Sequence, residues 1–540
     1  MRTKKLLPIL LVLIALPAIS FAQELLVPLN DDYQTDIQQV VYRSKYRFHT
    51  SMRPWIESDI AKIINLDSLK NTRRIEKRFN KRWKQEAWDM VFNKNFLSVR
   101  GDDFFIAVNP NIDFQVGNDK RSNETIWVNT RGVEIKGTIG KNVAFYTNVK
   151  ENQAVFPQYL TDYSYENEII PGQGKYKRFK GKGFDFSNTT AYIAYAPSHW
   201  LNLQLGQGKN FIGDGYRSLI LSDNAFPYPF LKLTAKIGNV QYTVLYNQMI
   251  DLQSKFEENI GYERKYTTMH YLSWAITKRL NINFFDAVVW QAKDSTGQRN
   301  FDLQYLNPII FLRPVEFSVG SPDNALMGLG ASYIFGQHTV AYGQVVFDEF
   351  RWKEIKNQNG WYANKQAFQL GIKAYNSFGV KNLFLQTEYN YVRPYMYTHY
   401  QQNYAHYNAA LAHPWGANFW ESVSRVNYHY NRWYMQYQLN FGVYGGDIVA
   451  EDGTVLNYGG DIFKNYRMYV NEYGNKVGQG LKTNILINDL TLSWLVNPIY
   501  NLNIFANLTI RNVENDLIKE NDVIFRFGIR TSLERYYYDF

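Results

Sequence analysis

The chain has 540 residues, a formal net charge of +10, no cysteine and an aromatic content of 17%. Without cysteine the fold cannot depend on disulfides, and we expect no lipoprotein anchor. The positive charge favours an anionic partner.

The first 22 residues have the pattern of a secretory signal peptide. Three basic residues precede an apolar stretch from Leu6 to Ile19, and Ser20-Phe21-Ala22 is a small-x-small cleavage site. We therefore expect residues 1–22 to be removed and Gln23 to begin the mature protein. Because no apolar run near 18 residues follows Ala22, the sequence predicts no membrane helix.

Residues 23–100 lack the strand pattern of the rest of the chain. They predict two helices, Ser58 to Lys70 and Thr72 to Phe96, and seven Lys or Arg residues crowd the second between Arg73 and Lys84. We expect a periplasmic helical segment that either plugs the mouth of the following domain or lies against its base with a solvated basic face. Because the signal peptide directs the protein out of the cytoplasm, nucleic acid is not the expected partner of this basic segment.

Most of the chain after residue 100 alternates apolar and polar residues. From Tyr500 to Arg511, even positions such as Leu502, Ile504 and Leu508 are apolar, whereas Asn503 and Asn507 are polar. Successive side chains of a strand point to opposite faces, so one face is apolar and the other wet. Such segments are predicted at 104–117, 124–138, 141–152, 188–197, 200–208, 230–237, 238–250, 265–277, 280–292, 326–336, 337–350, 365–377, 380–393, 421–431, 432–445, 483–497, 499–513 and 522–534.

The gaps between these strands alternate between short and long. Gaps such as Ser198-His199 and Lys278-Arg279 are tight turns, whereas 153–187, 209–229, 293–325, 394–420 and 446–482 are long. Short periplasmic turns and long outer loops are the rule in transmembrane β-barrels. The sequence therefore predicts an all-β, antiparallel transmembrane β-barrel of about 18 strands over residues 101–540, in the bacterial outer membrane. Both termini are expected in the periplasm, with a bulge or bend before Phe540 because its parity differs from that of the last strand.

One outward gap begins with a glycine-rich sequence. Gly206-Gln207-Gly208-Lys209-Asn210-Phe211-Ile212-Gly213-Asp214-Gly215-Tyr216-Arg217-Ser218 contains no phosphate-binding loop, because no Gly-Lys-Ser/Thr follows at the required spacing. Two interpretations stay open. The loop folds tightly into the barrel mouth, held by Asp214, Arg217 and Asp223, or Asp214, Arg217 and Asn224 contact a ligand directly.

The second candidate is the aromatic loop 394–420. Its rings can stack on sugar rings while Tyr or His edges bind hydroxyl groups. Tyr400, His406, Trp415 and Trp420 are the candidate contacts, although the loop could instead only cover the barrel mouth. His399, His406 and His413 are seven residues apart and lack the tight, mixed ligand pattern of a zinc site. We therefore predict no metal and no cofactor.

No catalytic constellation stands out. Acidic pairs such as Asp102-Asp103 and Glu257-Glu258 lie at strand ends or in loops, where solvated charge is the simpler interpretation than a glycosidase pair. The sequence therefore predicts a protein without enzymatic activity.

Three segments carry a family resemblance. The glycine-rich motif with Leu221-Ser222-Asp223-Asn224-Ala225, the segment Arg313-Pro314-Val315-Glu316 with Ser321-Pro322-Asp323-Asn324-Ala325, and Ala412-His413-Pro414-Trp415-Gly416-Ala417-Asn418 resemble the gliding-motility RemB group of Bacteroidetes, within the Wzi-like capsule-assembly family. The resemblance spans roughly residues 100–535. It implies an 18-stranded barrel with periplasmic helices, attachment of capsular polysaccharide or a role in gliding, and gliding-machinery proteins as partners.

The residues and the resemblance together predict an outer-membrane barrel that binds or organises surface polysaccharide. The polysaccharide is expected to be acidic, and outer-membrane lipid and lipopolysaccharide surround the barrel. A transport channel is the main alternative. The bulky residues at strand positions expected to face the lumen argue for an occluded pore, namely Phe505, Arg511, Arg526 and Arg530. An outer-membrane hydrolase is the second.

Overall fold

A computed structural model describes residues 25–29, 33–44, 46–64, 73–257, 261–294, 297–309, 312–319, 323–531 and 536–540. The predicted signal peptide lies outside these residues, as do residues 65–70 of the first predicted helix and residues 321–322 of one family segment.

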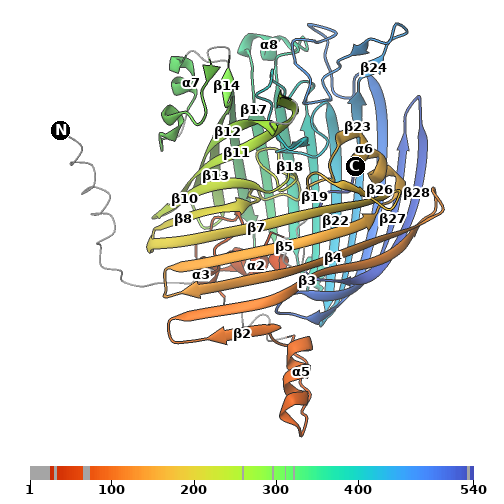
Figure 1. The fold of residues 1–540 in the computed structure, drawn as a ribbon. Coiled ribbons are helices and arrows are strands. Elements are labelled where there is room, and N and C mark those ends of the chain that lie inside the picture. The colour runs from red at the N-terminus through yellow and green to blue at the C-terminus, as the bar shows by residue number, and fades with distance from the viewer. Residues whose placement is uncertain are drawn as a thin grey trace.

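Eighteen antiparallel strands close into a barrel in the described part of the chain, which confirms the predicted fold class (Figure 1). They are β3 (Phe104–Asp119), β4 (Glu124–Ile139), β5 (Val143–Val155), β7 (Gly183–Ser198), β8 (Leu201–Gly208), β10 (Tyr228–Ile237), β11 (Val240–Glu257), β12 (Gly261–Ala275), β13 (Leu280–Gln291), β16 (Asn324–Phe335), β17 (Thr339–Phe347), β18 (Gln366–Tyr375), β19 (Leu383–Val392), β22 (Phe419–Tyr430), β23 (Trp433–Gly446), β26 (Leu481–Asn497), β27 (Leu502–Glu514) and β28 (Lys519–Arg530). The last strand closes the ring on the first, with Phe527 opposite Val116.

Short elements accompany the ring. The helices are α2 (Gln34–Arg43), α3 (Glu57–Ala61), α5 (Arg82–Phe92), α6 (Gln158–Asn167), α7 (Arg313–Val319) and α8 (Trp352–Asn357), with 3-10 turns η1 (Leu303–Leu306) and η2 (Ser377–Gly379). The short strands are β1 (Met52–Arg53), β2 (Leu97–Arg100), β6 (Lys177–Phe179), β9 (Phe211–Ile212), β14 (Lys293–Asp294), β15 (Gly297–Gln298), β20 (Ala405–His406), β21 (Ala409–Ala410), β24 (Ile448–Val449) and β25 (Val455–Leu456). No helix in the described ranges has the length and apolar character needed to cross a membrane.

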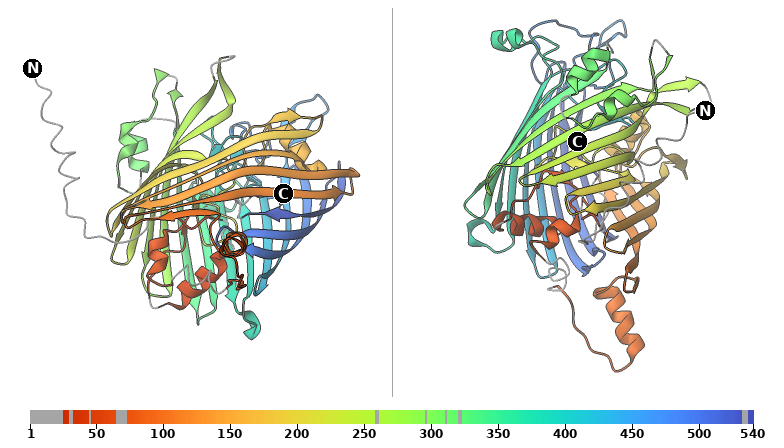
Figure 2. Two further views of the ribbon diagram at one scale, coloured as in Figure 1. Left: turned by 60° about the horizontal axis from the view of Figure 1, so that its bottom comes forward. Right: turned by 90° about the vertical axis from the view of Figure 1, so that its left-hand side faces the viewer.

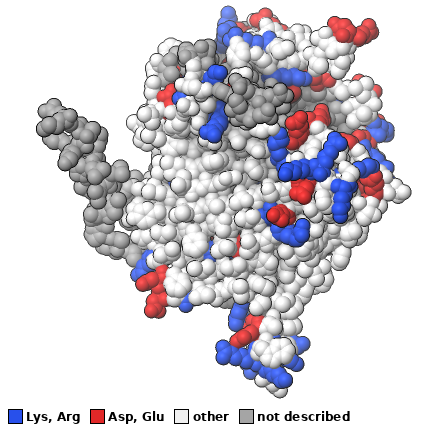
Figure 3. Space-filling model, in the orientation of Figure 1, with Lys and Arg blue, Asp and Glu red and all other residues white. Residues whose placement is uncertain are grey.

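The alternating sequence pattern produces an apolar outer face and a polar lumen. On β27, Ile504 and Leu508 are each 38% exposed on the outside, whereas Asn507 and Thr509 are buried inside. Figure 3 shows a broad band of the wall with few charged side chains, and charges gather near the loops and around α5. An apolar band around a closed barrel is the arrangement that bilayer lipid requires, so the chain is an outer-membrane barrel with its short turns in the periplasm.

The segment before β2 enters the barrel from the side of the short turns. Tyr375 at the end of β18 donates its hydroxyl to Gln38 of α2 at 2.8 Å, and His429 of β22 lies 3.2 Å from Asp36. Further along, β1 pairs with β9, which belongs to the glycine-rich loop. The segment is therefore inserted in the lumen, and Figure 2 shows α2 and α3 within the ring.

Both predicted N-terminal helices are shorter than expected. The first is helical only from Glu57 to Ala61 among its described residues, and the second only from Arg82 to Phe92, while α2 was not predicted. Residues 73–81 are not helical, and Arg73 is buried in the lumen, paired with Asp36 and 4.4 Å from the Tyr33 ring centroid. The Asn93 side chain holds this stretch extended by bonding the backbone N–H and C=O of Ile75.

The C-terminus does not end in the periplasm, so that expectation was wrong. The strand β28 ends at Arg530 beside the short turns, but residues 536–540, here called the C-terminal tail, lie inside the lumen and reach the loop end. The ring of Phe540 lies 4.5 Å from the ring of Tyr163 in α6, between centroids, and the Arg511 Nε atom donates to the Phe540 carbonyl oxygen at 2.8 Å. Phe540 is thus a lumenal anchor and not a wall residue.

Candidate functional site

The glycine-rich loop between β8 and β10 folds into the lumen. Residues 209–225 are buried along their whole length, and Gly213 donates its amide to the Ser51 carbonyl oxygen of the inserted N-terminal segment. A Cβ atom at Gly215 would lie 2.8 Å from a carboxylate oxygen of Glu388. Glycine is therefore required at this position, because the backbone passes directly against a buried carboxylate of the wall.

The aromatic loop interlocks with the glycine-rich loop. The hydroxyls of Tyr397 and Tyr404 donate to the carbonyl oxygens of Leu219 and Ile220 at 2.7 and 2.8 Å, and the amide of Ser222 donates to the Leu411 carbonyl oxygen at 2.8 Å. Residues 209–227 and 393–418 together form what we call the mouth seal. The sequence-based alternative of a loop folding into the barrel mouth describes this arrangement.

A buried charge network lies under the mouth seal. The Arg217 guanidinium is fully buried, 2.7 Å from Glu421 Oε1 and 3.0 Å from Asp539 Oδ1 of the C-terminal tail. Burial alone would lower the pKa of Arg217, but Asp539 and Glu421 raise it well above its ordinary value. The residue is therefore a permanent cation that joins a loop, the wall and the tail.

The acidic partners of this network were not predicted. Glu388 on β19 accepts the backbone amides of Tyr216 and Arg217 at 2.8 and 2.9 Å. Glu421 on β22 also contacts His413 Nε2 at 2.7 Å. Both glutamates occupy lumenal positions of their strands. A carboxylate on the lumenal parity of a predicted barrel strand was the signal that could have identified them.

The seven candidate residues fall into three environments. Asp214, Arg217, Asn224, His406 and Trp415 belong to the mouth seal, and the first four are almost completely buried. Asp214 accepts from the Thr50 hydroxyl at 2.6 Å, and Asn224 donates its amide to the Ala410 carbonyl oxygen at 3.0 Å. Direct contact with an external ligand would require these four residues to leave their partners.

The two remaining candidates differ. Trp420 lies in β22 on the outer face, where its ring centroid is 5.2 Å from that of Phe441 and 6.0 Å from that of Tyr389. It therefore faces lipid with other aromatic residues and does not point over the mouth, which corrects the expectation from the sequence. Tyr400 is 36% exposed at the loop end and is the candidate that remains open to solvent.

Buried histidines make the mouth seal sensitive to acid. His406 accepts the Ile250 amide at Nδ1, and its Nε2 atom has no hydrogen-bond partner among the described residues. Burial, together with nearby Lys265, lowers the pKa of His406 to about 3, and burial lowers the pKa of His399 to about 4. A free histidine titrates near 6.5, so the opened loop binds a proton more readily than the closed one.

We predict that the mouth seal loosens as the pH falls. Because the pKa of His406 is lower in the closed state, its contribution is complete above about pH 6.5 and declines as the pH falls toward 3. At pH 5 the loss from this residue alone is roughly 2 kcal/mol. Protease cleavage within residues 393–418 should therefore increase between pH 7 and pH 5, and His406→Gln should show a smaller increase. A cleavage rate independent of pH in the unmodified protein would contradict this prediction.

Aromatic residues also gather on the outer loops. We define the outer aromatic cluster as Trp361, Tyr362, Tyr395, Tyr400, Tyr466 and Tyr469. Tyr362 and Tyr469 stack with centroids 3.8 Å apart, Tyr400 meets Tyr466 edge-on at 6.1 Å, and the Arg467 guanidinium lies 4.8 Å from the Tyr400 ring centroid. Trp352 and Tyr473 are 73% and 48% exposed, and each follows a residue that contacts the cluster: the Arg351 guanidinium lies 4.5 Å from the Trp361 ring centroid, and the Tyr362 amide donates to the Glu472 carbonyl oxygen at 2.9 Å. The density of aromatic residues in 446–482 was the sequence signal for these contacts.

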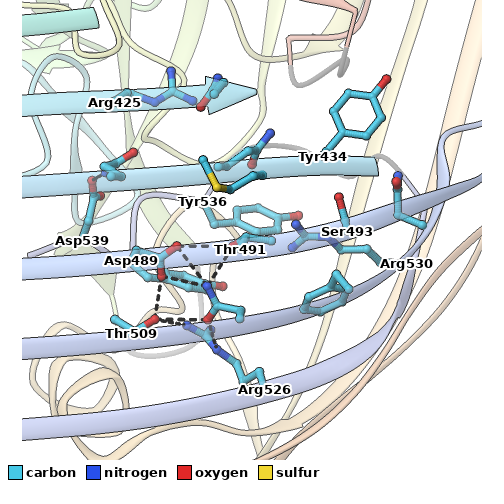
Figure 4. A pocket seen from close by; sticks show the side chains of 18 of the residues that line it. Arg425, Tyr434, Asp489, Thr491, Ser493, Thr509, Arg526, Arg530, Tyr536 and Asp539 are labelled. Atoms are coloured by element: carbon cyan, nitrogen blue, oxygen red, sulfur yellow. Dashed lines mark hydrogen bonds between the residues drawn. The ribbon is translucent and has the colours of Figure 1, made fainter. Parts of the chain in front are cut away.

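A cavity of about 390 Å³ lies in the lumen beside the C-terminal tail. Figure 4 shows Arg425, Arg526 and Arg530 with Tyr434, Tyr536 and Asp539 around it. Arg526 donates to Asn507 and Thr509, while Asp489 accepts from the same two side chains. The cavity thus combines guanidinium, amide, hydroxyl and aromatic groups. No cluster of His, Cys, Asp and Glu in the described ranges has a metal-binding arrangement.

Comparisons with known proteins support the fold. The solved structure of Wzi, an outer-membrane protein involved in group 1 capsule assembly in Escherichia coli and described as a carbohydrate-binding β-barrel, matches with a TM-score of 0.56. The identity is 14%, over 95% of this chain and all of that one. Pseudomonas aeruginosa OprD matches with a TM-score of 0.41 and 9% identity, over 82% of this chain and 96% of the other. Neither the protein-family models nor the curated protein sequences gave a match.

Proposed function

We propose that this outer-membrane barrel binds surface polysaccharide at its outer loops. The observation that carries the proposal is the exposure of Trp352, Tyr400 and Tyr473 on the outer loops that build the outer aromatic cluster. Sugar rings pack on flat aromatic faces, and neighbouring polar groups orient their hydroxyls. The fold shared with Wzi, a barrel described as carbohydrate-binding, supports this proposal.

The mouth seal turns the loop end into a closed platform. The glycine-rich and aromatic loops hold each other by backbone and tyrosine hydrogen bonds, so the outer loops rest on a fixed base. A fixed base reduces the entropy lost when a long, flexible chain binds. The predicted role of Asp214, Arg217, Asn224, His406 and Trp415 accordingly becomes support of the platform.

The ligand class follows from charge. The chain carries 59 Lys and Arg against 49 Asp and Glu, which favours an acidic polysaccharide over a neutral one. Binding should then weaken as salt increases, since exposed charges are screened. Lipopolysaccharide is the expected neighbour of the barrel wall.

We predict that removing the exposed rings abolishes most of the binding. Aromatic contacts contribute about 0.5–1.5 kcal/mol each, so Trp352→Ala with Tyr400→Ala should weaken binding of purified surface polysaccharide about 5- to 150-fold. Trp420→Ala is the matched control, because this ring faces lipid beside Phe441. The measurement is retention of fluorescent polysaccharide by cells that display equal amounts of each variant. Equal retention by the double variant and the parent would remove the proposal.

The resemblance to the RemB group extends the proposal to gliding motility. Polysaccharide held at the cell surface can serve as an adhesive in gliding or as a capsule, and gliding-machinery proteins would be partners only in the first case. Deleting the gene in its own host separates the two roles. Lost colony spreading with normal capsule supports gliding, and lost capsule retention with normal spreading supports capsule attachment.

A further inference from the structure

The C-terminal tail is bound inside the barrel as a ligand would be. The Asp539 carboxylate accepts hydrogen bonds from Arg217, Tyr216, Gln438 and Asn440 at 2.6 to 3.1 Å. These four donors come from a loop and from the wall. These side chains form a carboxylate-binding site, and Asp539 of the tail occupies it.

The tail also holds the loop end together. The Tyr537 hydroxyl donates to Asp223 of the mouth seal at 2.6 Å, and the Tyr159 hydroxyl of α6 donates to the Tyr538 carbonyl oxygen at 3.0 Å. Phe540 packs on the rings of Tyr159 and Tyr163. Two outer loops thus depend on the tail for contacts beneath them.

The lumenal cavity extends between the two ends of the barrel. At the periplasmic end it is lined by Leu383, the first residue of β19, and Asn382 just before it, and at the loop end by Pro157 and Tyr159, which follow β5. Tyr536, Tyr538 and Asp539 of the tail form part of its lining. Gly215 and Tyr216 of the mouth seal line it as well, so the tail, α6 and the mouth seal together close its loop end.

We propose that the cavity is a closed conduit for small anions and that the C-terminal tail is its plug. This activity is separate from polysaccharide binding by the outer loops. Among the described residues, five Lys or Arg and four Asp line the cavity, and Asp539 is one of the four. Withdrawal of the tail leaves five Lys or Arg against three Asp in the lining and removes one partner of Arg217. The opened conduit therefore attracts chloride and small carboxylates and repels cations.

Planar bilayer conductance tests the plug. The full chain is compared with a chain ending at residue 535 and with full-length Asp539→Ala, each first shown to keep the heat-modifiable gel mobility of a folded barrel. Asp516→Ala is the control, because it removes an exposed carboxylate between β27 and β28. We expect few conductance steps from the full chain and the control. The truncated chain should give steps at least tenfold more often, with a reversal potential that favours chloride over potassium, and Asp539→Ala should lie between.

A peptide with the sequence of residues 536–540, added to either chamber, should block the truncated barrel, and the same peptide with alanine for aspartate should block it poorly. If the truncated barrel is folded and gives as few conductance steps as the full chain, the proposal is overturned. If the truncated chain does not fold, the full-length Asp539→Ala variant decides the question. Conductance steps that the peptide suppresses support the plug, and the absence of additional steps overturns it. Trp352→Ala with Tyr400→Ala, which removes exposed rings of the outer loops and no tail contact, should leave the conductance of the full and the truncated chain unchanged, which separates this conduit from the outer binding surface.

Discussion

Replacing Arg217 by methionine should destabilise the folded barrel by about 3–5 kcal/mol, because Glu421 and Asp539 would keep their buried charges without a cation. The side chain is fully buried, and its Nε and Nη2 atoms donate to both oxygens of Glu421 at 3.1 and 2.7 Å. The free energy of unfolding can be measured by urea titration in lipid vesicles, with gel mobility as the readout of folded barrel.

Two further variants show whether charge is the cause. Arg467→Met makes the same substitution at an arginine that is exposed at the loop end, and it should lower the free energy of unfolding by less than about 0.5 kcal/mol. In Arg217→Met with Glu421→Met, one uncompensated carboxylate is gone, so the loss should be smaller than in the single variant. A double variant less stable than the single would mean that packing, and not the unpaired charge, sets the cost.

The wall of the barrel could be predicted because lipid imposes a two-residue period. Each predicted strand has a counterpart in the structure, with boundaries shifted by a few residues; the segment 499–513, for example, corresponds to Leu502–Glu514. Backbone groups within a bilayer must be paired by neighbouring strands, so alternation and length suffice to identify the strands. Leu502 is an exception to the predicted lipid contacts. It has the outward parity but is buried in a cluster with Tyr500 and Val496, against which Phe92 of α5 packs.

The lumen carries no such period, so its contents were harder to predict. In the sequence, Asp214 and Arg217 look like solvent-exposed charged residues. Only their contacts with Thr50, Glu421 and Asp539 show that they are buried. Those partners lie more than 150 residues away along the chain. The tail was misplaced for a similar reason, since Phe540 was interpreted by its parity in a strand that ends at Arg530.

The second large effect is expected on the lipid face. Leu508 lies in the middle of β27 and is 38% exposed on the outer surface. Leu508→Arg should cost about 2–4 kcal/mol, because the guanidinium would enter the centre of the bilayer. Ile504→Arg, near the periplasmic end of the same strand, should cost less, since its side chain can reach the interface. The measurement is the free energy of unfolding in vesicles of fixed lipid composition.

The control is a position on the inner face, two strands from β27 in the sheet. Gln436 on β23 is opposite Thr491, which is opposite Asn507, the neighbour of Leu508, and Gln436 lines the cavity. Gln436→Arg places the same charge in a polar lumen and should cost less than about 1 kcal/mol. The contrast between the two arginines reports mainly which face meets lipid, because both positions lie within spanning strands and receive the same side chain. Equal losses in Leu508→Arg and Gln436→Arg would show that the assigned faces are wrong, and a larger loss in Gln436→Arg would show that the lumen is too tightly filled to admit the side chain.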